Sequence, residues 1–457
     1  MMKRIFTFLL CMSILFSASS CASSIAVTEE GKKTAQTEEK KEESEKKTEE
    51  KKDPIVLPQG FSAGFGQATA NPGVGVGLGG YSNPETRKSK KILDDLKISA
   101  IAVSDGTEVF LLYAIDFLYV SDDILNTVAK RMETRYDGIA IPIENILINA
   151  SHTHAAPAIY SKSGMTDDVA MYMKTFYSAL YDATDKAMAD LAPATLLSGE
   201  TRTKDLNWVR RYVTPDGKTF LGNWPDPKLD PSEGKHETEA DNQLQVVSFA
   251  REGKKDVVLV NWQCHTTTTG SPKKGDISAD WAGAMRDAVE KESDVHCAFF
   301  QGAAGNLIPG SYIKGEKDNS EDHVKHGKEV AEAVVEAMNA LKPVEGTEMK
   351  AQRFQFTATE KDGVDTSNFY IGVLSIGDFA LAAVPGEFHD TLGAYVKEHS
   401  PFSRTFFCAY SNANISYVPS AEAMDLGGYE PGKMRFVKGT GEAVSEKLVE
   451  MLGDLKK

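Results

Sequence analysis

The chain has 457 residues, a formal net charge of −15, and 41% hydrophobic and 26% charged residues. Its length suits one large domain or two ordinary ones, and its composition is ordinary for a soluble globular protein. The acidic balance argues against a nucleic-acid partner, because phosphate binding needs a basic surface.

The first 21 residues have the layout of an export signal. Lys3 and Arg4 precede an apolar run at 5–16, and small residues lead to Cys21. The run is shorter than the roughly 20 residues that span a bilayer. Small residues before a cysteine resemble a bacterial lipoprotein signal, in which Cys21 becomes the lipidated N-terminus. We expect an exported cell-surface lipoprotein anchored at Cys21, with plain secretion as the alternative.

Residues 22–54 are predicted to be a disordered, charged tether. The stretch 29–53 is almost wholly Glu, Lys, Thr and Gln. It has no apolar face that could offset the entropy of ordering it. The folded domain is therefore expected at 55–457.

The body of the chain alternates apolar runs of strand length with amphipathic helical stretches. This alternation predicts an α/β protein in which layered, mixed β-sheets are flanked by helices in a single large catalytic domain. Residues 203–241, rich in Gly, Pro, Asp and Asn, are predicted to form a long loop over the surface or over a site. The predicted strands are 98–103, 109–115, 146–149, 257–262, 298–300, 369–376, 379–384 and 405–410, and the predicted helices are 121–136, 167–191, 279–292, 322–341 and 388–397.

Several predicted strands end in chemically capable residues: His152 and His154 in NASHTHAAP, His265 in VNWQCH, Glu387 in VPGEF, and Tyr417 after TFFCAY. Ligands of open α/β sheets bind outside the carboxyl ends of strands. If these ends converge, they offer the nitrogen and oxygen donors of a catalytic zinc site, and the absence of cysteine argues against a structural thiolate site. A lone histidine at a strand end is more often a hydrogen-bonded residue, and Glu387 also suits a helix start.

The motifs, in their order, resemble neutral/alkaline ceramidases, which are zinc-dependent amidohydrolases. ASHTHAAPA resembles the family's "THTHSGP", and VNWQCH resembles the strand with its second zinc histidine. VPGEF is similar to "PGEFT", and SNANISYVP to "SNxYxGYVT". GFGQATANP with LGGY resembles the family's opening, and ISADWAGAM with CAFFQGAAGN resembles its "SxDxxGxA…FxQxxxGD" stretch.

The resemblance implies a Zn²⁺ ion held by four residues, and three further residues with catalytic roles. His154 would be a proton carrier or oxyanion partner, Tyr429 a second active-site tyrosine, and Arg210 (or Arg211 beside it) the substrate-facing arginine. The implied zinc ligands are His152, His265, Glu387 and Tyr417.

Three departures from the family bear on the substrate. Ile308 replaces a serine of "GDVSPN", the stretch 203–241 differs, and the C-terminal immunoglobulin-like domain of true ceramidases is expected to be absent. The leading hypothesis is a zinc hydrolase that cleaves an amide of a small-molecule or lipid N-acyl substrate by a metal-activated water. The alternatives are a zinc esterase or deacylase on another substrate, and a non-catalytic exported solute-binding lipoprotein.

Overall fold

A computed structural model describes residues 55–81, 84–159, 166–213, 219–221, 235–236, 239–269, 274–309 and 322–457. The predicted signal and tether lie outside the described residues. Contacts between residues group Pro54–Lys457 into one unit, to which the following description applies. In the described part of the chain, no helix combines the length and apolar character needed to cross a membrane.

The larger of the two main sheets contains nine strands. Eight follow the order β14-β12-β11-β6-β1-β3-β4-β5, and β16 pairs with β6. The outer pairs, β12–β14 and β4–β5, are parallel. β1 and β6 share only two residue pairs, so the sheet divides there into two halves. The strands are β1 (Ser62–Thr69), β3 (Lys97–Ser104), β4 (Val109–Ile115), β5 (Ile146–Ala150), β6 (Ala192–Arg202), β11 (Gln243–Arg251), β12 (Val257–Trp262), β14 (His296–Gln301) and β16 (Lys342–Pro343).

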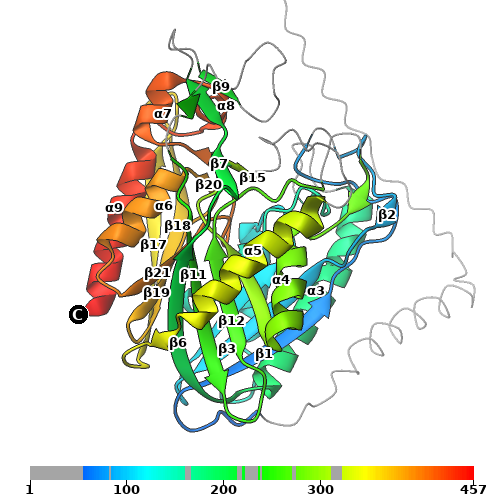
Figure 1. Ribbon diagram of the computed structural model, residues 1–457, viewed down its shortest axis with the longest axis vertical. Helices are drawn as coiled ribbons and strands as arrows, with labels where there is room; N and C mark the ends of the chain where they lie inside the picture. Colours follow the sequence, from blue (N-terminus) through cyan, green and yellow to red (C-terminus); the bar gives the residue numbers. More distant parts are fainter. Residues whose placement is uncertain are drawn as a thin grey trace, which may run out of the picture. The chain divides into compact units, whose positions relative to one another are not determined.

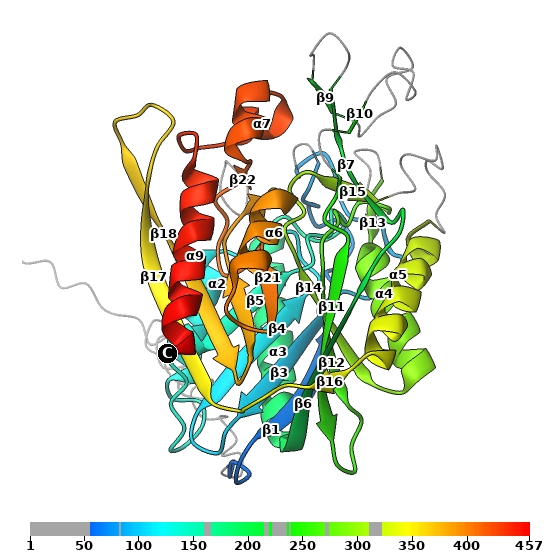
Figure 2. The ribbon, with the colours of Figure 1, turned by 60° about the vertical axis from the view of Figure 1, so that its left-hand side comes forward.

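The second main sheet has the order β17-β18-β19-β21. Its first two strands form a long hairpin that is prominent in Figure 2. Phe379 and Phe406 of this sheet share one buried cluster with Phe110 and Phe249 of the larger sheet, so the two sheets enclose a common core. The strands are β17 (Met349–Thr359), β18 (Thr366–Ile376), β19 (Phe379–Ala383) and β21 (Arg404–Cys408).

Helices cover the outer faces of both sheets (Figure 1). α3 packs against β1 and β3, α4 and α5 lie side by side on the half that contains β6, β11 and β14, and α9 packs on β17, β18 and α6. The helices are α2 (Asp122–Met132), α3 (Asp167–Ala189), α4 (Asp280–Ser293), α5 (Asp322–Asn339), α6 (Asp390–His399), α7 (Ala421–Leu426), α8 (Tyr429–Lys433) and α9 (Thr440–Lys456), with a 3₁₀ turn at Ile143–Asn145.

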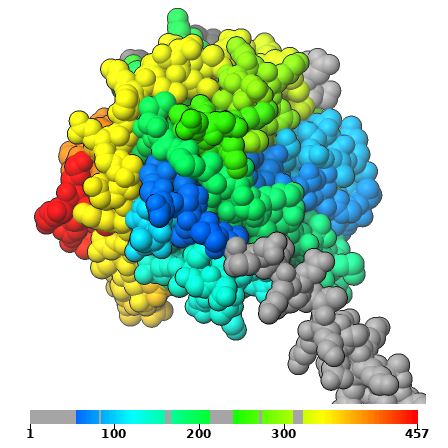
Figure 3. Space-filling model, turned by 90° about the horizontal axis from the view of Figure 1, so that it is seen from below, coloured from blue at the N-terminus to red at the C-terminus, as the bar shows by residue number. Residues whose placement is uncertain are grey.

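Two glycines of β1 explain how closely α3 approaches the sheet. A Cβ atom at Gly64 would lie 2.1 Å from the carbonyl oxygen of Ala187, and one at Gly66 would lie 2.0 Å from that of Ala183. A larger residue at either position would push the helix away. In the view from below, a blue segment near the start of the described chain lies between cyan and green segments on the surface (Figure 3).

The predicted layered α/β class is confirmed, and every predicted strand and helix is present, β4 and β12 with the predicted bounds and the others with shifted ends. The prediction of a long loop at 203–241 is wrong in part, because short strands form there. β7 pairs with β15, and β8 pairs with β9 and β10. The remaining short strands are β2 (Lys91–Ile92), β7 (Asn207–Val209), β8 (Arg211–Val213), β9 (Thr219–Leu221), β10 (Lys235–His236), β13 (Asp276–Ile277), β15 (Leu307–Pro309), β20 (Glu387–Phe388) and β22 (Tyr417–Val418).

Candidate active site

Three of the strand-end residues meet around one carboxylate oxygen. The Nε2 atoms of His152 and His265 each lie 3.3 Å from Oε2 of Glu387. His152 follows β5, His265 follows β12, and Glu387 begins β20 just beyond β19. All three side chains are almost fully buried. The structure thus brings together residues that lie up to 235 positions apart in the sequence.

The outer nitrogens of both imidazoles are held by backbone carbonyls. Nδ1 of His152 lies 2.9 Å from the oxygen of Leu118, and Nδ1 of His265 lies 2.7 Å from that of Ala304. A carbonyl only accepts, so each Nδ1 carries a proton, and in the neutral form of the imidazole Nε2 then presents a lone pair. This arrangement is typical of metal-bound histidines, whose second nitrogen donates to a carbonyl or carboxylate.

The inner atoms form a buried cluster of acceptors. Nε2 of His265 and Oε2 of Glu387 have no hydrogen-bond partner among the described residues, although they face each other. Lone pairs that converge away from water are costly unless a cation or proton lies between them. Two neutral imidazoles and one carboxylate are donors that suit Zn²⁺. The residues present therefore fit a metal ion.

The protonation states agree with this interpretation. Burial lowers the pKa of His265 to about 4, with Arg210 adding to the effect, so its imidazole is neutral at pH 7. Burial alone would raise the pKa of Glu387, but His152 and His265 hold the pKa of its carboxyl well below the usual range. The result is an ionised carboxylate beside the neutral imidazole of His265.

His154 lies against the same cluster. Its Nε2 is 3.1 Å from Nε2 of His152, and its ring nitrogens form a group with those of His152 and His265 that could hold a metal ion. Burial, followed by the neighbouring imidazoles, lowers the pKa of His154 well below its ordinary value. A neutral imidazole in this place can act as a base or as a further ligand.

The backbone around the histidine pair is not extended, contrary to the simple two-residue alternation of a strand. β5 ends at Ala150, and His152 has a φ of 65°, in the left-handed region. The two rings still meet, because the chain turns at His152. Gly80 accommodates this turn. Its φ is +93°, and a Cβ there would lie 2.4 Å from Cγ of His154. That contact gives the LGGY motif a physical role.

Tyr417 lies next to Glu387, and Arg210 lies against Tyr417. β20 pairs with β22 so that Glu387 is opposite Tyr417. The guanidinium carbon of Arg210 lies 5.4 Å from the Tyr417 ring and 5.7 Å from the Tyr429 ring, and its Nη2 atom has no hydrogen-bond partner in the described part. Arg211 points instead to the carbonyl of Gly427. Arg210 is therefore the arginine on the tyrosine side.

Burial raises the pKa of Tyr417 well above its ordinary value, and Glu387 reinforces the shift. Burial and Glu387 therefore favour the protonated hydroxyl. A bound cation would favour the phenolate, since opposite charge stabilises the ionised form. Tyr429 is 41% exposed, so it lies at the edge of the site.

Sequence reasoning missed three residues of this site. Tyr119 donates to Oε1 of Glu387 at 2.8 Å, and the ring of Tyr410 lies 4.3 Å from that of His152. Glu430, which is fully buried, pairs with Nε of Arg210 at 2.7 Å and with Arg211 at 3.1 Å. Tyr119 and Tyr410 follow β4 and β21, so the strand-end pattern could have found them. No sequence signal marked Glu430.

The fold and the site together define a layered α/β protein with a buried histidine–carboxylate centre at its strand ends. Residues 61–309 match the family described as neutral/alkaline non-lysosomal ceramidase, N-terminal. The chain therefore belongs to this family, as its motifs predicted.

Solved structures have the same fold. The crystal structure of neutral ceramidase from Pseudomonas aeruginosa is 19% identical, with a TM-score of 0.71 over 87% of this chain and 75% of that chain. A ceramidase complexed with C2 is 18% identical, with a TM-score of 0.71 over 87% and 76% of the two chains. No curated protein matches the sequence significantly.

Proposed function

We propose that the protein is a zinc-dependent amidohydrolase that cleaves the amide bond of an N-acyl lipid of the ceramide type. The observation that carries this proposal is the buried group of acceptors formed by His152, His265 and Glu387. Family membership supports the reaction class. A structure of similar fold, a ceramidase complexed with C2, supports a lipid substrate.

His152, His265, Glu387 and Tyr417 would hold the metal. Zinc in such a site lowers the pKa of bound water towards 7 and polarises a carbonyl. The remaining requirements of amide cleavage are a proton carrier and donors for the developing oxyanion. Both must come from the residues around the ligands.

His154 is placed to move the proton. Its buried, neutral imidazole can accept a proton from the attacking water and return it to the leaving nitrogen. Arg210 can stabilise the oxyanion, because Glu430 fixes its Nε while Nη2 stays available to donate. Tyr429 can add a hydrogen bond from the exposed edge. Ile308 is buried in β15 and offers no nucleophile, which leaves the water mechanism unaffected.

The test has two parts, metal and substrate. Purified protein from residue 55 onward should carry about one zinc ion per chain by elemental analysis. It should release fatty acid from an N-acyl sphingosine and lose this activity on chelation. The matched ester of the same acyl chain separates an amidohydrolase from an esterase. Protein without zinc and without turnover of either substrate would favour a binding lipoprotein and overturn the proposal.

We further propose that the protein is exported and held at the cell surface by a lipid on Cys21. The layout of the first 21 residues supports this. Metabolic labelling with a lipid precursor and membrane fractionation test it. Cys21→Ser should abolish labelling and release the protein from the membrane fraction. An unchanged distribution would remove the anchor.

A further inference from the structure

A short segment between β14 and β15, residues 304–306, makes hydrogen bonds to three parts of the site. The carbonyl of Ala304 holds Nδ1 of His265 at 2.7 Å. The carbonyl of Asn306 accepts from the backbone N–H of Arg210 at 2.8 Å. Gly305 donates its N–H to the carbonyl of Phe388, next to Glu387, at 2.8 Å. A shift of this segment would therefore move a histidine, a carboxylate and an arginine together.

The contact with the Glu387 strand is too close for a side chain. A Cβ at Gly305 would lie 2.5 Å from the carbonyl oxygen of Glu387. Backbone therefore packs directly on backbone at Gly305. Because Gly305 has no side chain, side-chain hydrogen bonds that fix the segment against β20 and α6 must come from a neighbouring residue.

Asn306 and Asp390 provide these hydrogen bonds. The Nδ2 of Asn306 donates to Oδ1 of Asp390 at 2.7 Å, and the backbone N–H of Asp390 donates to Oδ1 of Asn306 at 2.9 Å. Both side chains are at least 98% buried. Reciprocal bonds of this kind fix both the distance and the rotation of the two segments, because each amide atom has one matching partner.

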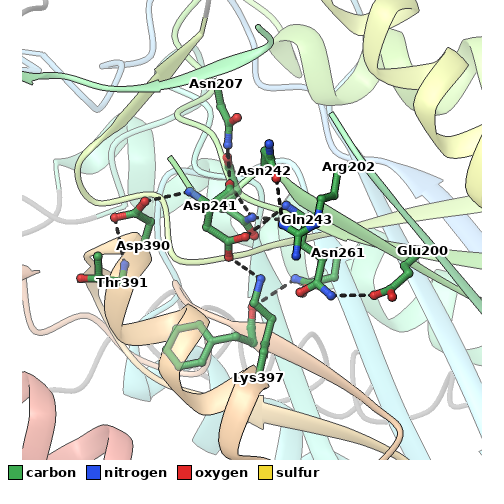
Figure 4. Close-up of polar contacts among 12 residues, drawn as sticks. Glu200, Arg202, Asn207, Asp241, Asn242, Gln243, Asn261, Asp390, Thr391 and Lys397 are labelled. Atoms are coloured by element: carbon green, nitrogen blue, oxygen red, sulfur yellow. Dashed lines mark hydrogen bonds and ion pairs between the residues drawn. The ribbon is translucent and has the colours of Figure 1, made fainter. Parts of the chain in front are cut away.

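Asp390 also links the segment, through Asp241, to the β7 strand that precedes Arg210. Its Oδ2 accepts from the backbone N–H of Asp241 at 2.9 Å, while the carboxylate of Asp241 pairs with Lys397 of α6. The carbonyl of Asp241 accepts from Asn207, in the β7 strand just before Arg210. Figure 4 shows Asp241 among Asn207, Asp390 and Lys397, so α6 and β7 are joined through one loop.

We propose that Asn306 and Asp390 are positioning residues for the metal centre. They set the segment that orients His265, Glu387 and Arg210 without touching the metal or substrate. This inference rests on the proposed function, because it assigns the pair a role toward the bound zinc. No motif interpretation gave either residue a role.

The chemistry of the pair suggests a swap experiment. Asn306 supplies one donor and one acceptor, whereas a carboxylate supplies acceptors alone. Asn306→Asp has nearly the same shape but places two buried carboxylates face to face. In the double variant Asn306→Asp/Asp390→Asn, the amide on residue 390 donates to the carboxylate on residue 306 and still accepts from Asp241. The two side chains are then paired again, although the backbone N–H of Thr391, which donates to Oδ1 of Asp390 at 2.9 Å, loses its acceptor.

The measured quantity is the zinc dissociation constant, from competition with a chelating indicator. We expect Asn306→Asp to raise it about 10- to 100-fold, as loss of a supporting partner does. The double variant should bind zinc more tightly than Asn306→Asp, and the lost bond from Thr391 should keep it weaker than wild type. Asn368→Asp, the same change at an exposed position of β18, should leave the dissociation constant unchanged. If Asn306→Asp fails to fold, Asn306→Ser removes the reciprocal bonds without adding charge and should weaken zinc binding similarly.

The outcomes separate the inference from the proposed function. Wild type that binds no zinc overturns the proposed function. Wild type that binds zinc while Asn306→Asp or Asn306→Ser binds it equally well overturns the inference alone. A weakened single variant that the swap does not rescue also overturns it, because the pair would not act through its mutual bonds.

Discussion

The hydroxyl of Tyr119 donates a hydrogen bond of 2.8 Å to Oε1 of Glu387, across 268 residues of chain. Its backbone neighbour Leu118 accepts from Nδ1 of His152. The turn after β4 therefore orients one carboxylate and one imidazole at once. It leaves Oε2 of Glu387 facing the two histidines.

Tyr119→Phe should weaken zinc binding while the fold is retained. Removal of the hydroxyl leaves Oε1 without its donor, so the carboxylate is free to rotate away from the imidazoles. We expect about a 10-fold or greater rise in the zinc dissociation constant, measured by chelator competition. Tyr370→Phe removes a 41% exposed tyrosine hydroxyl on β18 and serves as the control. Equal affinities in the two variants would contradict an orienting role for Tyr119.

His152→Ala and His154→Ala should fail in different ways. His152 is the ligand in the proposed site, so His152→Ala should lose the metal and the activity. His154→Ala should keep about one zinc per chain and lose about 10²- to 10⁴-fold in turnover, because the proton carrier is gone. Elemental analysis and single-substrate kinetics check both. Loss of zinc from His154→Ala would make His154 a ligand, as its distance of 3.1 Å from His152 allows.

Glu430→Gln should destabilise the protein far more than a surface charge change. It removes the charge that pairs with both buried arginines, Arg210 and Arg211. Breaking a buried pair costs roughly 3–5 kcal/mol, since the remaining charge is left uncompensated. Urea unfolding at pH 7 measures the loss. Asp425→Asn breaks the exposed pair with Lys438 and should cost less than about 1 kcal/mol. Similar losses in both variants would show that the buried pair is dispensable.

The pattern of apolar and polar residues in the sequence predicted the strands and helices better than it predicted the residues that position the site. The apolar runs that became β4 and β12 are buried on both faces, and such runs are visible in sequence. β1 was missed because five of its eight residues are Gly, Ala or Ser, and the small size of its two glycines lets α3 pack closely. β6 and β17 alternate irregularly between exposed and partly buried positions, so no clear period marks them.

The same division holds within the site. His152, His265 and Glu387 follow apolar strands, so their chemistry stands out from the run before them. Glu430 and Asp390 lie in ordinary polar sequence, and only tertiary contacts across 220 and 84 residues reveal their partners. Long-range pairing of this kind leaves no local period. A single sequence therefore indicates the candidate metal ligands, but it does not indicate the residues that hold those ligands in place.

Asp390 should make the stability of the protein depend on pH in a defined window. Burial raises the pKa of its carboxyl to about 6 from 3.8, despite the hydrogen bond from Asn306. Below pH 3.8 the carboxyl is protonated in both the folded and the unfolded state, so it does not lower the folding stability. Between 3.8 and about 6 the unfolded chain loses the proton first, so folding stability falls as pH rises. Above that range both states are ionised and the effect is constant.

The measurement is the difference in unfolding free energy between wild type and Asp390→Asn from pH 3.5 to pH 8. Asn cannot titrate, so other groups cancel in the difference. Wild type should lose about 3 kcal/mol relative to the variant as pH rises through the window, and the curve should be level above about pH 7. The opposite result is a wild type that loses stability relative to Asp390→Asn as pH drops. It would mean that the hydrogen bonds from Asn306 and Asp241 outweigh burial, and that the carboxyl pKa is depressed.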